Sequence, residues 1–191
     1  HTLSLFYTAT KNWGKYLQTL RKAEAWVEKV NFEEASFLFQ ALIGEIYLDL
    51  GDALQEVQES EEALIGLEKV VAIYRKMGRL YELGKALNNI GTVYQSLHQW
   101  GNALASYEES LKVFEEYDTG QQELYEQSAF SLFEYTHVDF LKAQTHQNMG
   151  ALYLTLRKFD LANDFLQKAH AGYTQFPETE ELASIESNLG R

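Results

Sequence analysis

Three asparagines share one local setting, because each stands two residues before a glycine in the tripeptide NIG, NMG or NLG. They are Asn89, Asn148 and Asn188. A side-chain amide carries both hydrogen-bond donors and an acceptor, so it suits contact with a peptide backbone. Asparagine is also a poor former of helix interiors. Its recurrence in a helical pattern therefore leaves two explanations open: hydrogen bonds within and between the helices, or contact with a bound polypeptide.

Residue patterns typical of catalysis or of metal binding do not occur in the sequence. The five histidines form no HExxH motif and no pair spaced one helical turn apart. The sequence also lacks the GxSxG nucleophile motif, the phosphate-binding loop and the dinucleotide fingerprint. We therefore expect no enzyme activity, no cofactor and no metal site.

The glycines that follow the asparagines belong to a spacing that recurs along the chain. A glycine is followed by an aromatic residue three positions on, by alanine twelve positions on, and by a large apolar residue one turn later. The complete copies are Gly91, Tyr94, Ala103, Tyr107 and Gly150, Tyr153, Ala162, Leu166. Gly44 and Tyr47 begin a third copy, in which Ala63 comes seven residues later than the spacing requires. Partial copies stand at both ends, at Ser4 and at Gly190.

This spacing resembles the pattern of the tetratricopeptide repeat (TPR) family, in its long-repeat, kinesin-light-chain-like type. The matching residues of the clearest copy are Leu87, Ile90, Gly91, Tyr94, Ala103 and Tyr107. The resemblance covers nearly the whole chain except about 118–142. It implies an all-α fold, a right-handed α-solenoid of antiparallel helix pairs that forms a TPR-like superhelix.

The repeats predict one TPR-like domain over residues 1–191, which we expect to be part of a longer protein. Its parts are a partial repeat at 1–30, repeats at about 37–77, 84–117 and 143–176, a partial repeat at 183–191, and an inserted helical segment at about 118–142. Helices are expected near 12–29, 33–50, 59–77, 79–98, 101–117, 137–156, 159–174 and 179–190. Seven aromatic residues are expected in the core: Phe37, Phe39, Tyr47, Tyr74, Tyr94, Phe114 and Tyr153.

In the TPR family the position of the three asparagines lines a concave groove, which implies that they contact a bound peptide. The residues expected along that groove are Lys85, Asn88, Asn89, Thr92, Gln95, Gln144, Gln147, Asn148 and Asn188. This surface is mostly neutral and polar. The resemblance favours a non-catalytic scaffold for a peptide or protein partner. The alternative is a sensor or regulatory region of a larger signalling protein, whose ATPase or protease effector lies outside this chain.

Composition narrows the classes of partner. The formal net charge is −12, which argues against a nucleic-acid backbone as partner, because such binding needs a basic surface. No apolar run approaches the roughly 18 residues needed to cross a bilayer, so membrane insertion is not expected. The chain has no cysteine, which fits a reducing compartment. We therefore expect a cytoplasmic protein that binds other proteins.

Overall fold

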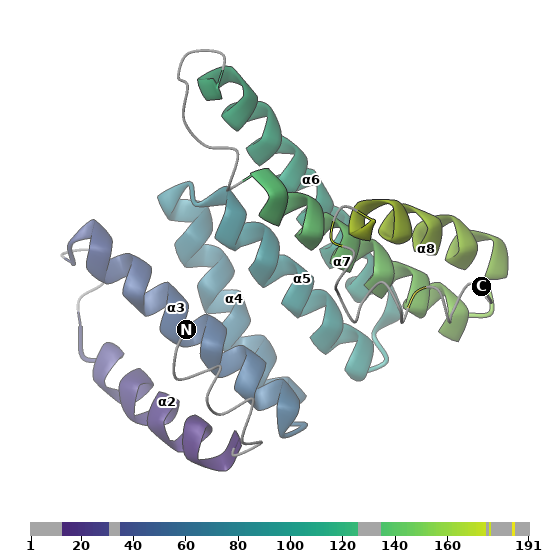
Figure 1. Ribbon diagram of the computed structural model, residues 1–191. Helices are drawn as coiled ribbons and strands as arrows, with labels where there is room; N and C mark the ends of the chain where they lie inside the picture. Colours follow the sequence, from purple (N-terminus) through teal and green to yellow (C-terminus); the bar gives the residue numbers. More distant parts are fainter. Residues whose placement is uncertain (1–12, 31–34, 126–134, 175, 177–184, 186–191) are drawn as a thin grey trace. The chain divides into compact units, whose positions relative to one another are not determined.

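The computed structural model describes the backbone of residues 13–30, 35–125, 135–174, 176 and 185, and the side chains of these residues outside 121–137. Every regular element in this part of the chain is an α-helix (Figure 1). The helices are α2 (Trp13–Val27), α3 (Phe37–Glu56), α4 (Ser60–Met77), α5 (Leu80–Ser96), α6 (Trp100–Tyr125), α7 (Tyr135–Thr155) and α8 (Phe159–Tyr173).

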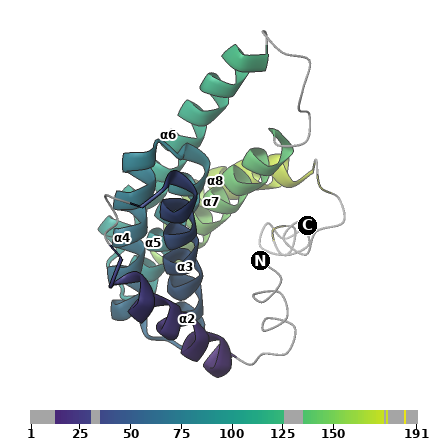
Figure 2. The same ribbon diagram turned by 90° about the vertical axis from the view of Figure 1, so that its left-hand side faces the viewer.

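The chain divides into two compact units, residues 1–98 and 99–191. In the first unit, α3 packs against α2 and α4, and α4 packs against α5. In the second unit, α7 packs against both α6 and α8. Figures 1 and 2 show these helices lying side by side in succession within each unit. The predicted all-α repeat fold is therefore confirmed.

The turns after α3, α5 and α7 have the same backbone conformation. Gln58, His98 and Arg157 follow these helices with positive φ angles of 65°, 59° and 56°. After α3, the N–H of Glu59 donates to the carbonyl of Leu54 at 2.9 Å, which is the long hydrogen bond of a Schellman motif. A left-handed residue ends a helix sharply, so each of these turns can start a new helix within two residues.

The second helix of each pair buries the same three positions. The first and second positions are four residues apart, and the third follows seven residues later, so all three lie on one helix face. The buried sets are Tyr16, Leu20, Val27 in α2; Ala63, Leu67, Tyr74 in α4; Ala103, Tyr107, Phe114 in α6; and Ala162, Leu166, Tyr173 in α8. This shared pattern identifies α2, α4, α6 and α8 as equivalent helices.

The glycines on the first helices allow close contact with this buried face. A Cβ atom at Gly150 would lie 2.8 Å from the Leu166 side chain, and one at Gly51 would lie 2.6 Å from Leu67. Gly51 therefore corresponds to Gly150, and it precedes Ala63 by the expected twelve residues. The choice of Gly44 as the start of this copy was wrong, because Gly44 lies two turns earlier and packs against the ring of Tyr74 instead.

With Gly51 in place, the repeats have a regular length. Gly51 and Gly91 are 40 residues apart, as are Gly150 and Gly190, whereas Gly91 and Gly150 are 59 residues apart. The longer interval contains the predicted insertion at about 118–142. Both ends of that insertion are helical, because α6 continues to Tyr125 and α7 begins at Tyr135. Residues 126–134, Gly190 and the helix expected near 179–190 lie outside the described residues, apart from Ile185 within that helix.

Two further expectations need correction. The first helix of the 37–77 repeat ends at Glu56, not at residue 50, because Gly51 is an interior packing residue of α3 rather than its end. Phe37 is 59% exposed, because it lies in the first turn of α3, before the buried residues that begin at Ile43. Phe39 and Tyr94 are only partly buried. The remaining four predicted core aromatics are buried: Tyr47, Tyr74, Phe114 and Tyr153.

Candidate functional site

Two polar stripes lie on neighbouring first helices of the first unit. The α3 stripe is acidic and consists of Glu45, Asp49, Asp52 and Glu56. The α5 stripe occupies the positions 40 residues further on, at Lys85, Asn89, Thr92 and Ser96. Intervals of four, three and four residues place each stripe on one helix face. We call the surface formed by these two stripes, together with Gln55, the α3–α5 face.

Side-chain hydrogen bonds join the two stripes. The Asn89 amide nitrogen donates to Asp52 Oδ1 at 2.5 Å. The Thr92 hydroxyl lies 2.7 Å from Gln55 Oε1 and 2.8 Å from the Asn89 carbonyl, so its single proton can serve either acceptor. Asn89 and Thr92 therefore link α5 to α3, as one of the two explanations for the recurrent asparagine requires.

Tyrosines from the second helices hold two other carboxylates of the α3 stripe. Tyr16 of α2 donates to Asp49 Oδ2 at 2.7 Å, and Tyr74 of α4 donates to Glu45 Oε1 at 3.0 Å. Burial and the neighbouring Glu45 carboxylate raise the pKa of Tyr74, so it remains a neutral donor. These hydrogen bonds fix the carboxylates in position without neutralising their charge.

Asp52 is the carboxylate most affected by its surroundings. Water reaches it at the surface, yet protein atoms crowd it from most sides, and this desolvation raises its pKa to about 7. The negative charges of Asp49 and Glu56 raise the pKa further, whereas Lys85 and the hydrogen bond from Asn89 lower it. An added cation beside Asp52 would favour the charged form.

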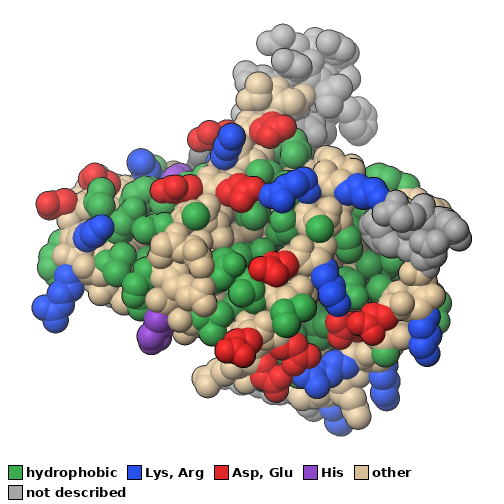
Figure 3. All heavy atoms as spheres, turned by 180° about the vertical axis from the view of Figure 1, so that it is seen from behind, with side chains coloured by type: hydrophobic (Ala, Val, Ile, Leu, Met, Phe, Trp, Pro, Cys, Tyr) green, Lys and Arg blue, Asp and Glu red, His purple; other side chains and the backbone are tan. Residues whose placement is uncertain are grey.

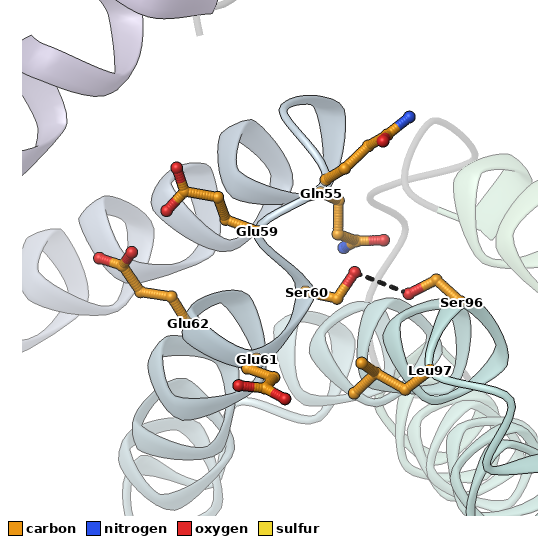
Figure 4. A pocket seen from close by; sticks show the side chains of 8 residues that line it. Gln55, Glu59, Ser60, Glu61, Glu62, Ser96 and Leu97 are labelled. Atoms are coloured by element: carbon orange, nitrogen blue, oxygen red, sulfur yellow. Dashed lines mark hydrogen bonds between the residues drawn. The ribbon is translucent and has the colours of Figure 1, made fainter.

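Two open pockets adjoin the α3–α5 face. The smaller, with a volume of about 290 Å³, is lined by Trp13, Asp52, Gln55, Glu56, Asn89 and Thr92. The larger, of about 780 Å³, is lined by Gln55, Gln58, Glu59, Ser60, Glu61, Glu62, Ser96 and Leu97. Figure 4 shows the larger pocket, where Ser60 and Ser96 form a hydrogen bond of 2.8 Å. Gln55 lines both pockets, so the two adjoin.

The structure distributes the nine predicted groove residues over α5, α7 and one position outside the described residues. On α5, Asn88 is buried, with 6% of its surface exposed, whereas Lys85 and Gln95 are partly buried. On α7, Gln144 and Asn148 are partly buried, and Gln147 accepts a hydrogen bond from Tyr173 of α8 at 3.1 Å. Asn188 lies outside the described residues.

The sequence-based interpretation missed the acidic stripe on α3. In the copy that starts at Gly44, the residue two positions before the glycine is Leu42. Counted from Gly51, the same position is Asp49, directly equivalent to Asn89 and Asn148. The 40-residue interval between Gly51 and Gly91 was the signal that could have revealed this stripe.

The second unit contains one strongly perturbed imidazole. Burial, together with the nearby positive charges of Lys168 and Lys142, lowers the pKa of His146 to about 4. Its ring lies 6.0 Å from that of Phe165, so His146 is a neutral packing residue at ordinary pH. No group of three or more potential metal ligands occurs among the described residues. Within the same ranges, no helix is long and apolar enough to cross a membrane.

Comparisons with known proteins identify the repeat. Residues 42–116 match the family described as tetratricopeptide repeat. Outer dynein arm-docking complex subunit 4 of Xenopus laevis is 30% identical over 105 residues, a match that covers 54% of this chain. The chain spans only 18% of that relative's length.

Solved structures share the fold over almost the whole chain. One is a Signal Transduction ATPase with Numerous Domains (STAND) protein with a tetratricopeptide repeat sensor, from Pyrococcus horikoshii, with a TM-score of 0.72 and 19% identity over 98% of this chain and 25% of that one. Another consists of nearly identical kinesin light chain TPR-like repeats from Podosopora anserina, with a TM-score of 0.65 and 15% identity over 99% of this chain and 81% of that one. The resemblance predicted from the sequence is thereby confirmed, and these likenesses show the fold alone.

Proposed function

We propose that the chain, whose residues 42–116 match the tetratricopeptide repeat family, is a non-catalytic interaction module that binds a polypeptide segment along the first helices of its repeats. The observation that carries the proposal is the α3–α5 face, where ordered polar side chains border two open pockets. Stacked repeats provide an extended surface rather than a deep, water-excluding cavity. Such a surface suits recognition of an extended segment better than catalysis.

The recurrent asparagines fit this function on the proposed surface. An amide nitrogen carries two donor hydrogens, and the bond from Asn89 to Asp52 uses one of them. We propose that Asn89 in the first unit and Asn148 in the second contact the backbone of the partner. The neighbouring Gln95 and Gln144 would add further neutral donors and acceptors.

The test compares binding with stability for Asn89→Ala and Asn148→Ala. Each variant should weaken binding of a partner, identified by cross-linking to the wild-type chain, by about 1–3 kcal/mol, because polar groups of the partner lose their hydrogen bonds. Asn163→Ala is the matched control, because Asn163 is an exposed asparagine on α8, and it should leave affinity unchanged. Early melting combined with normal affinity in both test variants would assign the asparagines to helix–helix contact and reject the proposed surface.

A second candidate function is a sensor or regulatory region within a larger signalling protein. It is favoured by the fold shared with the STAND protein, whose tetratricopeptide repeats are described as its sensor. In that case partner binding would control an ATPase or protease effector encoded in the same reading frame. Sequencing the complete reading frame distinguishes the two functions, because an interaction scaffold needs no effector domain.

A further inference from the structure

We propose that the α3–α5 face binds a basic segment of the partner, and that an arginine or lysine side chain of this segment enters the pocket beside Trp13. This inference rests on the proposed function and specifies the chemistry of the partner.

The first support is the excess of negative charge on the α3 stripe. Among the described residues, no lysine or arginine forms an ion pair with any of its four carboxylates. Asp49 and Glu45 accept hydrogen bonds from tyrosines, and Asp52 accepts one from the Asn89 amide. These donors are neutral, so they hold the carboxylates in place without supplying positive charge. In the described part of the chain, the one cation that acts on Asp52 is Lys85, and an added cation would favour the charged form of Asp52. Opposite charges on a partner would be attracted to such a surface and oriented by it.

The second support is the composition of the smaller pocket. Two carboxylate residues, Asp52 and Glu56, line it together with the indole of Trp13. Its volume of about 290 Å³ exceeds the roughly 150 Å³ of a cavity that holds benzene, so a long side chain fits. A guanidinium or ammonium group in this pocket gains carboxylate acceptors and an aromatic face for cation–π contact.

The larger pocket extends the same chemistry along the face. It shares Gln55 with the smaller pocket and adds three carboxylates, from Glu59, Glu61 and Glu62, which Figure 4 shows at the α3–α4 turn and the start of α4. Arg21 pairs with Glu59 and Glu62 at 3.2 and 2.7 Å, but the side chains of all three residues are more than 40% exposed. Exposed pairs of this kind contribute little, so a cationic partner can compete for these carboxylates.

Charge elsewhere on the molecule is distributed differently. On the side shown in Figure 3, acidic and basic side chains are interspersed. The α3–α5 face, in contrast, carries a single lysine, Lys85, beside four carboxylates. A basic segment is therefore expected to prefer this face over other parts of an acidic protein.

The test uses the complete chain with Trp26→Phe and Trp100→Phe, which leaves Trp13 as the only one of the three tryptophans. The probes are blocked peptides of alternating arginine and glycine, and the same peptides with lysine or glutamate in place of arginine. The arginine and lysine peptides should change Trp13 fluorescence in a saturable way, and the glutamate peptide should not. Absence of a saturable change with both basic peptides would overturn the inference.

Two double variants distinguish binding in the smaller pocket from non-specific attraction of a basic peptide to an acidic protein. Asp52→Asn/Glu56→Gln should weaken arginine-peptide binding at least tenfold. Glu68→Gln/Glu116→Gln also removes two carboxyl groups, from exposed positions on α4 and α6, and should weaken binding less than threefold. Equal losses in both variants would overturn the inference. Circular dichroism checks folding, and Glu56→Gln alone, expected to weaken binding at least threefold, replaces the first variant if that variant unfolds.

The outcome is separable from that of the proposed function. If the cross-linked partner needs Asn89 but the basic peptides do not bind, the interaction surface stands and its preference for cations is rejected. If the basic peptides bind through Asp52 and Glu56 but the partner binds both asparagine variants with normal affinity, the asparagine contacts are rejected and the cation-binding pocket stands.

Discussion

Helices α3 and α7 occupy the same place in their repeats, but they differ in the charge of one surface stripe. Glu45, Asp49, Asp52 and Glu56 of α3 correspond to Gln144, Asn148, Ala151 and Thr155 of α7, each 99 residues further on. One buried contact, in contrast, is retained, because Gly51 packs on Leu67 as Gly150 packs on Leu166. Two of the surface changes replace a carboxylate by its own amide. The glycine–leucine crossing is therefore common to both repeats, while the charge of the stripe varies and can change what each repeat binds.

The largest expected effect tests the shared core. Leu67→Ala and Leu166→Ala should each lower the free energy of unfolding by about 2–5 kcal/mol, because each removes the side chain that fills the space at a glycine. Urea unfolding measures both. Ile65→Ala, at a residue that is 59% exposed, is the control and should change stability by roughly 0.5 kcal/mol or less. A small loss at only one leucine would show that the two crossings are not equivalent.

An intermediate effect concerns an ion pair found in the second unit. Lys142 of α7 pairs with Asp118 of α6 and lies 3.7 Å from Asp139. The equivalent positions of α3 and α5 hold the buried residues Ile43 and Leu83. Asp118→Ala should cost about 1–3 kcal/mol, because it leaves a partly buried ammonium group without its main partner.

The double variant Asp118→Ala/Lys142→Leu copies the apolar arrangement of the first unit. It should recover most of the stability lost in Asp118→Ala, because the unpaired charge is gone. Urea unfolding of the two variants and the wild type gives the comparison. A double variant less stable than Asp118→Ala would show that Lys142 contributes mainly through its stem or through Asp139.

The smallest effect is the pH dependence that Asp52 of α3 contributes. The folded-state pKa of Asp52 is about 7, above the ordinary value of about 3.9 for an unfolded chain. The folded protein therefore holds this proton more tightly, and its contribution to stability is full below about pH 4 and is lost as the pH rises through 7. Asp52→Asn removes this loss, so its melting temperature relative to wild type should rise between pH 4 and 7 and then level off.

Thr92→Ala is the control for this titration, because it alters the same face without removing an ionisable group. Its difference in melting temperature from wild type should stay constant over the same pH range. A constant difference for Asp52→Asn as well would contradict the raised pKa of Asp52.

The sequence predicted the elements better than their register. The antiparallel helix pairs followed from one repeated spacing. The third copy was misplaced because Gly44 and Gly51 are seven residues apart, which puts them on nearly the same helix face. An amphipathic pattern cannot separate two such glycines, and only the distance between repeats identifies the correct one.

The prediction of the candidate site was affected by the same ambiguity in register. Asn89 was singled out from the sequence, but its partner Asp52 lies 37 residues away on another helix. Such a pair depends on how far α5 is shifted along α3, which no local pattern encodes. The α5 and α7 residues predicted a neutral surface. The correct register of α3 adds an acidic stripe beside the α5 residues.

The left-handed residues after α3, α5 and α7 have a consequence for engineering. None of Gln58, His98 and Arg157 is a glycine, although each holds a φ between 56° and 65°, a conformation that costs a residue with a side chain roughly 1–2 kcal/mol. The same small backbone strain is thus present in the turns after α3, α5 and α7. Glycine introduced at one, two or three of them would act as a graded adjustment of rigidity, applied at the ends of the helices and away from the packed glycines.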